Sequence, residues 1–95
     1  MLLLVGCAPS VAAQTQTVRG VLVDVHSTSI QRVDEFTLRT DDDQDLSFTP
    51  APDFNVGIEH VMTPGHMRQH MALGEPVTVT YRDENGTHIA LSATD

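Results

Sequence analysis

One short segment, residues 63–74, constrains the fold of this chain more than any other. It reads Thr-Pro-Gly-His-Met-Arg-Gln-His-Met-Ala-Leu-Gly and carries helix signals at both ends. Thr63 is suited to cap the first turn, Pro64 fits the first helical position, and Gly74 fits the residue that follows the last turn. Because the rest of the folded part alternates like short strands, the place of this single helix among the strands restricts the possible topologies.

Three strand-like segments precede the predicted helix and two follow it, at residues 18–26, 35–40, 45–49, 75–82 and 87–93. In the last four, alternation predicts a set of core residues, namely Phe36, Leu38, Leu46, Phe48, Val77, Val79, Tyr81, Ile89, Leu91 and Ala93. In the first, alternation groups Val21, Val23 and Val25 on one face, and Gly20 indicates a bulge or a tight bend. Residues 51–62 are predicted to form a loop that folds back and closes the open end of a barrel built from these strands.

The order strand-strand-strand-helix-strand-strand resembles the oligonucleotide/oligosaccharide-binding (OB) fold, a five-stranded Greek-key barrel with a helix at one end. More narrowly, it resembles the small exported OB-like domains of bacterial envelope proteins. The matching stretches are VRGVLV, FTLRTDD, GEPVTVTY and IAL, at residues 18–23, 36–42, 74–81 and 89–91. The resemblance implies an OB-like domain over residues 18–95 and implies no site. A split barrel of the SH3 type is the alternative, although it does not need a helix here.

The N-terminal residues 1–13 are apolar and uncharged, which is typical of the hydrophobic region of an export signal. The sequence Leu-Val-Gly-Cys at residues 4–7 resembles a bacterial lipobox, which implies lipidation of Cys7 and a short tether over residues 14–17. Cleavage after Ala13 is the alternative and would remove the cysteine. Both readings predict an exported protein, periplasmic or at the cell surface, with no membrane contact except through a lipid anchor.

Composition excludes several classes of function. The formal net charge is -8, with 13 acidic against 5 basic residues, and nucleic-acid binding requires a cationic surface instead. The single cysteine excludes an internal disulfide. The chain has no nucleophile elbow, no phosphate-binding glycine loop and no H-E-x-x-H motif. We therefore expect a protein that is not an enzyme and needs no cofactor.

Two histidines on the predicted helix raise the possibility of a metal site. His66 and His70 are four residues apart, so their rings project from one face and are able to bind a single ion. His60 and Met62 lie nearby in the sequence, and a mixture of histidine and methionine suits copper. A periplasmic protein that binds copper or zinc is therefore one functional hypothesis.

The same helix residues have a purely structural interpretation. At 100° per residue, the two histidines share an arc of about 160° with Met67, Met71 and Leu73. A helix that covers the end of a barrel needs such a face, and methionines fill irregular gaps well. On this interpretation the methionines belong to the core, while the histidines flank it and bond to backbone or water.

OB-like barrels bind ligands across the face of their second and third strands. Here that face is predicted to present a polar set with no aromatic ring, comprising Glu35, Thr37, Arg39, Asp45 and Ser47. Such a face has no ring to stack on a base or a sugar, and it is predicted either to contact a protein partner or to bind nothing specific. The neighbouring aspartates at residues 41–45 lack the spacing of a calcium-binding loop and are interpreted as a solvated hairpin tip. The sequence thus favours a non-catalytic binding or structural module of the bacterial envelope.

Overall fold

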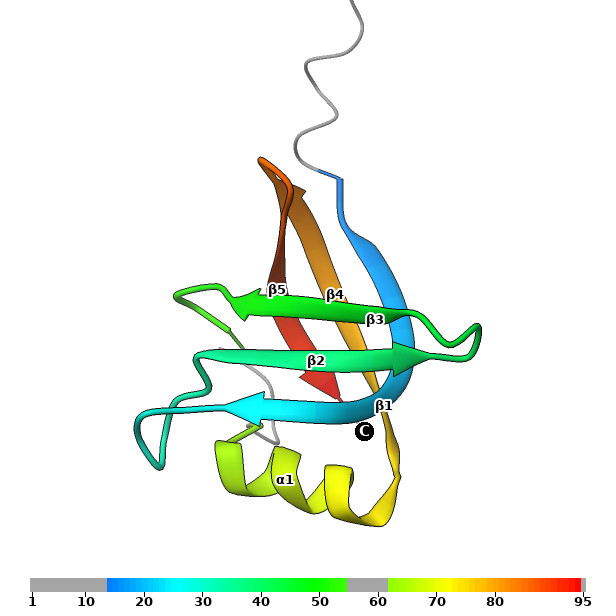
Figure 1. The fold of residues 1–95 in the computed structure, drawn as a ribbon. Helices are drawn as coiled ribbons and strands as arrows, with labels where there is room; N and C mark the ends of the chain where they lie inside the picture. The colour runs from blue at the N-terminus through cyan, green and yellow to red at the C-terminus, as the bar shows by residue number, and fades with distance from the viewer. Residues whose placement is uncertain (1–13, 55–61, 95) are drawn as a thin grey trace, which may run out of the picture.

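Five strands close into a barrel, and one helix covers one of its ends (Figure 1). The computed structural model describes residues 14–54 and 62–94. In chain order the elements are β1 (Gln16–His26), β2 (Glu35–Thr40), β3 (Asp45–Pro50), α1 (Pro64–Leu73), β4 (Pro76–Glu84) and β5 (Thr87–Thr94). Around the barrel the strands follow the order β1-β2-β3-β5-β4, with α1 between β3 and β4 along the chain. This arrangement confirms the predicted five-stranded OB-like barrel.

The long strand β1 belongs to both halves of the barrel. Its N-terminal part pairs with β4 and its C-terminal part pairs with β2, and Gly20 takes part in both pairings. A Cβ atom at this glycine would lie only 2.6 Å from the carbonyl oxygen of Arg39. Glycine is therefore required here, because the backbones of β1 and β2 approach each other too closely for a side chain.

The bulge in β1 lies at Val23 and not at Gly20. The register with β2 shifts by one residue just after Leu22. Because of this extra residue, Leu22 and Val25 are both buried while Val23 is 37% exposed. The predicted grouping of Val21, Val23 and Val25 on one face is therefore wrong, since strict alternation does not continue through a bulge.

A second register shift occurs between β4 and β5. After Tyr81 pairs with Ala90, the ladder skips Leu91 before it resumes. The buried residues of β5 are consequently Ala90 and Ala93, while Ile89 and Leu91 are only half-buried. The prediction was right for Ala93 and wrong for the other two, again because a bulge interrupts the alternation.

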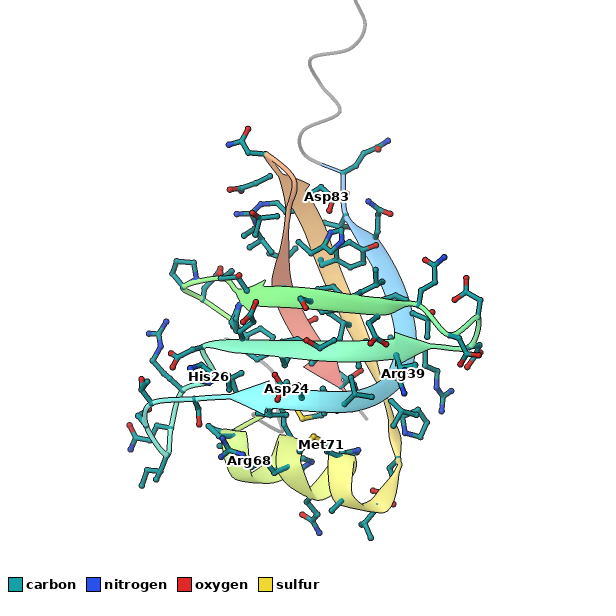
Figure 2. All side chains as sticks on the ribbon, viewed as in Figure 1. Asp24, His26, Arg39, Arg68, Met71 and Asp83 are labelled. Atoms are coloured by element: carbon teal, nitrogen blue, oxygen red, sulfur yellow. The ribbon has the colours of Figure 1, made fainter. Side chains whose placement is uncertain are left out.

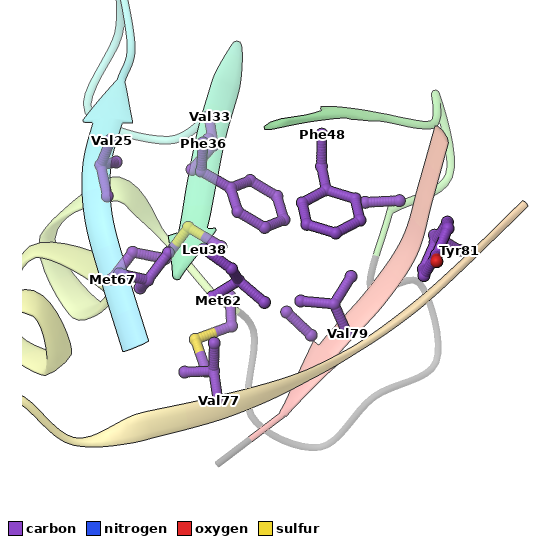
Figure 3. Close-up of a cluster of buried hydrophobic side chains, with 13 residues drawn as sticks. Val25, Val33, Phe36, Leu38, Phe48, Met62, Met67, Val77, Val79 and Tyr81 are labelled. Atoms are coloured by element: carbon purple, nitrogen blue, oxygen red, sulfur yellow. The ribbon is translucent and has the colours of Figure 1, made fainter. Parts of the chain in front are cut away.

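Aromatic rings from three strands fill the centre of the barrel (Figure 3). The rings of Phe36 on β2 and Phe48 on β3 stack with their centroids 5.3 Å apart. The ring of Tyr81 on β4 meets Phe48 edge to face at 5.1 Å. Contacts of this kind add about 0.5–1.5 kcal/mol each beyond burial. The predicted inward residues of these strands are confirmed as buried, apart from Leu46, which is half-buried against the core.

Both predicted ends of α1 are confirmed. The Thr63 side-chain oxygen accepts a hydrogen bond from the backbone N–H of His66 at 3.2 Å, and Gly74 ends the helix with a φ of 68°. The helix buries a stripe centred on Met67, with Met71 partly buried beside it. Leu73 was predicted on this face but is 63% exposed. It lies six residues from Met67, about 120° around the helix and outside the stripe.

The close approach at Gly20 gives a stability prediction. We expect Gly20→Ala to lower the free energy of unfolding by about 2–3 kcal/mol, because the new methyl group meets rigid backbone and β1 must move. Urea unfolding followed by circular dichroism measures the effect. Gly65→Ala is the matched control, since no atom lies within 4 Å of its added Cβ, and we expect it to be neutral or slightly stabilising. Equal stability of the two variants would contradict the argument.

Candidate functional site

The structure brings His66 and His70 into direct contact on α1. Their Nε2 atoms lie 3.2 Å apart, within hydrogen-bonding distance. The two rings are nearly parallel, with an interplanar angle of 15° and centroids 5.0 Å apart. Two nitrogen atoms that each carry a proton or a lone pair therefore face one another, as the spacing of four residues predicted.

The two histidines differ in their surroundings. His70 is only 7% exposed, whereas His66 is half-buried at the edge of the helix face. Behind the His70 ring, its Nδ1 lies 3.8 Å from the Glu75 carboxylate. This distance is too long for a hydrogen bond, but the negative charge still favours a proton on Nδ1. The lone pair of His70 is then on Nε2, the atom that faces His66.

The other predicted metal ligands are not part of this pair. Met62 is 4% exposed and packs in the core cluster together with Met67, so these methionines serve the barrel interior (Figure 3). His60 lies outside the described residues. Over residues 14–54 and 62–94, no group of three or more histidine, cysteine, aspartate or glutamate side chains is arranged to hold a metal ion. Of the four predicted metal ligands, the structure therefore brings together only His66 and His70 among the described residues.

The predicted binding face on β2 and β3 is occupied by its own side-chain pairs. Arg39 donates two hydrogen bonds to Asp45, at 2.9 and 3.2 Å, and the hydroxyls of Thr37 and Ser47 bond to each other at 2.9 Å. The hydrogen bond from Arg39 lowers the pKa of Asp45, and the same contact raises the pKa of Arg39. Glu35 is exposed at the strand start. A ligand on this face would have to compete with these internal bonds.

A shallow groove lies where the start of α1 meets the connection between β1 and β2. Its volume is about 480 Å³, and it is lined by Ser27, Thr28, Ser29, Ile30, Thr63, Pro64, Gly65 and Arg68. Arg68 extends from α1 toward the end of β1 (Figure 2). It donates hydrogen bonds to the Val25 carbonyl on β1 at 3.4 Å and to the hydroxyl of Ser27, just after β1, at 3.0 Å. Ile30 is 87% exposed. The groove combines a cation, hydroxyl groups and apolar surface.

Sequence reasoning missed this groove because its two walls are far apart in the chain. The only local signal is Ile30, a large apolar residue within a polar turn.

At the other end of the barrel, a polar network joins β1 to the β4–β5 hairpin. The Tyr81 hydroxyl donates to the Gln16 side-chain oxygen at 3.4 Å, and the Gln16 amide donates to Asp83 at 3.2 Å. The imidazole Nδ1 of His88 contacts the same carboxylate, and its ring meets Tyr81 edge to face at 5.1 Å. These groups bond mainly to one another, so we interpret the network as structural.

No protein-family model, curated protein or solved structure matches this chain significantly. In the described part of the chain, no helix has the length and apolar character needed to cross a membrane. The groove, the histidine pair and the N-terminal sequence are therefore the features of this chain that bear on its function.

The ion pair on the β2–β3 face gives a pH prediction. Because Arg39 lowers the pKa of Asp45 below its ordinary 3.8, the pair stabilises the fold above that pH, and the contribution is lost as pH falls. We expect Arg39→Gln to raise the pKa of Asp45 toward its ordinary value, measured by carboxyl NMR titration. Thr37→Val, on the same face, should leave that pKa unchanged. An identical pKa of Asp45 in the wild type and in Arg39→Gln would contradict the prediction.

Proposed function

We propose that this chain is an exported, lipid-anchored, non-catalytic binding domain of the bacterial envelope. Residues 1–13 support export through their apolar, uncharged composition, and Cys7 supports a lipid anchor through the lipobox-like sequence around it. Both features lie outside the described residues, so this part of the proposal relies on the sequence. The OB-like barrel supports a binding role, because such barrels bind ligands through the face of strands 2 and 3 and through loops that include the connection between strands 1 and 2.

The groove beside α1 is the single observation that carries the binding role. Three of its groups are able to recognise a ligand, namely the Arg68 guanidinium, the serine and threonine hydroxyls, and the exposed Ile30 side chain. The groove is shallow and open, with a volume of about 480 Å³, so it suits a short segment that lies along the surface. A ligand of a few residues or of comparable size fits these dimensions.

Charge indicates which ligands the groove selects. Arg39 and Arg82 are engaged by the carboxylates of Asp45 and Glu84. Arg68, by contrast, forms no ion pair with any residue of the described chain, and it bonds only to a hydroxyl and a carbonyl. A guanidinium with donors to spare binds carboxylates well. We therefore propose that the groove binds a protein segment that carries a carboxylate next to an apolar side chain.

The position of the first described residues fits this role. They lie beside the β4–β5 hairpin, at the end of the barrel opposite α1 (Figure 1). Residues 8–15 link Cys7 to β1 and span on the order of 30 Å when fully extended. A lipid on Cys7 would thus attach the domain at the end of the barrel opposite α1 and the groove.

The lipid anchor is tested with Cys7→Ser. Expressed from its own gene in a bacterium, the wild-type protein should incorporate labelled palmitate and sediment with membranes, because several acyl chains bind a bilayer stably. The serine variant should lose both properties. Intact-mass measurement provides the opposing outcome, since a mature protein that begins at Gln14 without lipid would reject lipidation and support simple secretion.

The groove is tested by NMR titration with a small probe, N-acetyl-leucyl-glutamate. We expect amide shifts at residues 27–30 and 63–68, and at least a tenfold loss of affinity in Arg68→Gln, because the carboxylate loses its cationic partner. The neutral probe N-acetyl-leucyl-glutamine amide should bind weakly. Arg39→Gln is the matched arginine control and should bind like the wild type. Shifts confined to the β2–β3 face would reject the groove as the site, and equal binding of both probes would reject recognition of a carboxylate.

A further inference from the structure

We infer that His66 and His70 form a binding site for a divalent transition-metal ion on α1. The inference is independent of the groove, because it depends on the two facing nitrogen atoms and their 3.2 Å separation. Imidazole nitrogen is the donor that zinc, copper and nickel ions share. No contact within the β2–β3 face or the groove contributes to it.

The separation of the nitrogens matches what an ion requires. Two imidazole nitrogens that bind zinc at 2.0–2.1 Å with tetrahedral angles lie about 3.3 Å apart. The observed distance is 3.2 Å between the Nε2 atoms. The helix is fixed by the cap at Thr63 and by the turn at Gly74, so both rings start from a defined backbone. An ion can therefore bind without rearrangement of the helix.

The same distance also fits a simple N–H···N hydrogen bond between the two Nε2 atoms. The positions of the ring protons therefore determine whether an ion is able to bind. Glu75 favours the proton of His70 on Nδ1, which leaves the Nε2 lone pair toward His66. In the empty pair, His66 then donates its Nε2 proton to that lone pair. Metal binding requires the tautomer of His66 that carries its ring proton on Nδ1, because both Nε2 lone pairs must then be available to the ion.

Packing of the methionines indicates the class of metal. Soft thioether ligands would favour Cu(I), but Met62 and Met67 pack in the core. Two imidazoles without these sulfurs favour divalent ions, with Cu²⁺ bound most tightly and Zn²⁺ more weakly. Among the described residues the two imidazoles are the protein ligands of this site, and so few ligands suit reversible binding.

Calorimetric titration of Cu²⁺ and Zn²⁺ into the purified full chain tests the inference. All variants carry Cys7→Ser, so that the thiol does not bind metal. We expect one ion per chain, with affinity at least tenfold weaker in His66→Ala and in His70→Ala. His88→Ala, which removes a histidine on β5, is the matched control and should bind like the parent. Glu75→Gln should weaken binding less than His66→Ala, because Glu75 acts only through the orientation of His70.

A second readout separates binding from folding, since His70 is buried and its loss weakens packing. Zn²⁺ should raise the melting temperature of the parent in proportion to the logarithm of its concentration, and should not raise that of His66→Ala. The electron paramagnetic resonance spectrum of bound Cu²⁺ should show coupling to two nitrogens. Unchanged affinity in His66→Ala, or a parent melting temperature that does not respond to Zn²⁺, would overturn the inference and leave a hydrogen-bonded pair only.

Discussion

The close contact between β1 and β2 at Gly20 is the constraint on which the rest of the structure depends. It allows a single strand to leave β4 and join β2 without a break in hydrogen bonding. The two halves of the barrel are connected on this side by β1 and on the other by the short parallel pairing of β3 with β5. The end of the barrel that α1 covers exists only because both connections hold.

Packing of α1 against that end also determines where its polar side chains lie. Met67 points into the core, and His70 lies about 60° from it around the helix, whereas His66 lies about 100° away. One ring is therefore buried while the other remains at the rim. From the sequence, core packing and metal binding were alternative roles for this helix. In the structure the two do not compete for the same residues, because the methionines and the histidines lie on neighbouring stripes of one helix.

Local signals were enough to predict β2, β4 and both ends of α1, since their alternation and capping residues act within a few positions. The faces of β1 and β5 could not be predicted in the same way. Their bulges at Val23 and Leu91 are set by pairing with other strands, and a local pattern contains no information about that register. The groove was missed for a similar reason, because topology alone joins residues 27–30 to residues 63–68.

The two candidate sites lie on opposite flanks of α1. Arg68 follows Met67 and His66 precedes it, so their side chains diverge by about 100° in opposite directions from the buried stripe. The groove is thus on one side of the helix and the histidine pair on the other. Side chains on the β2–β3 face bond to one another. The groups able to recognise a ligand therefore lie at the end of the barrel that α1 covers. This end is also the farthest from the N-terminal residues of the barrel, where an anchor would hold the domain (Figure 1).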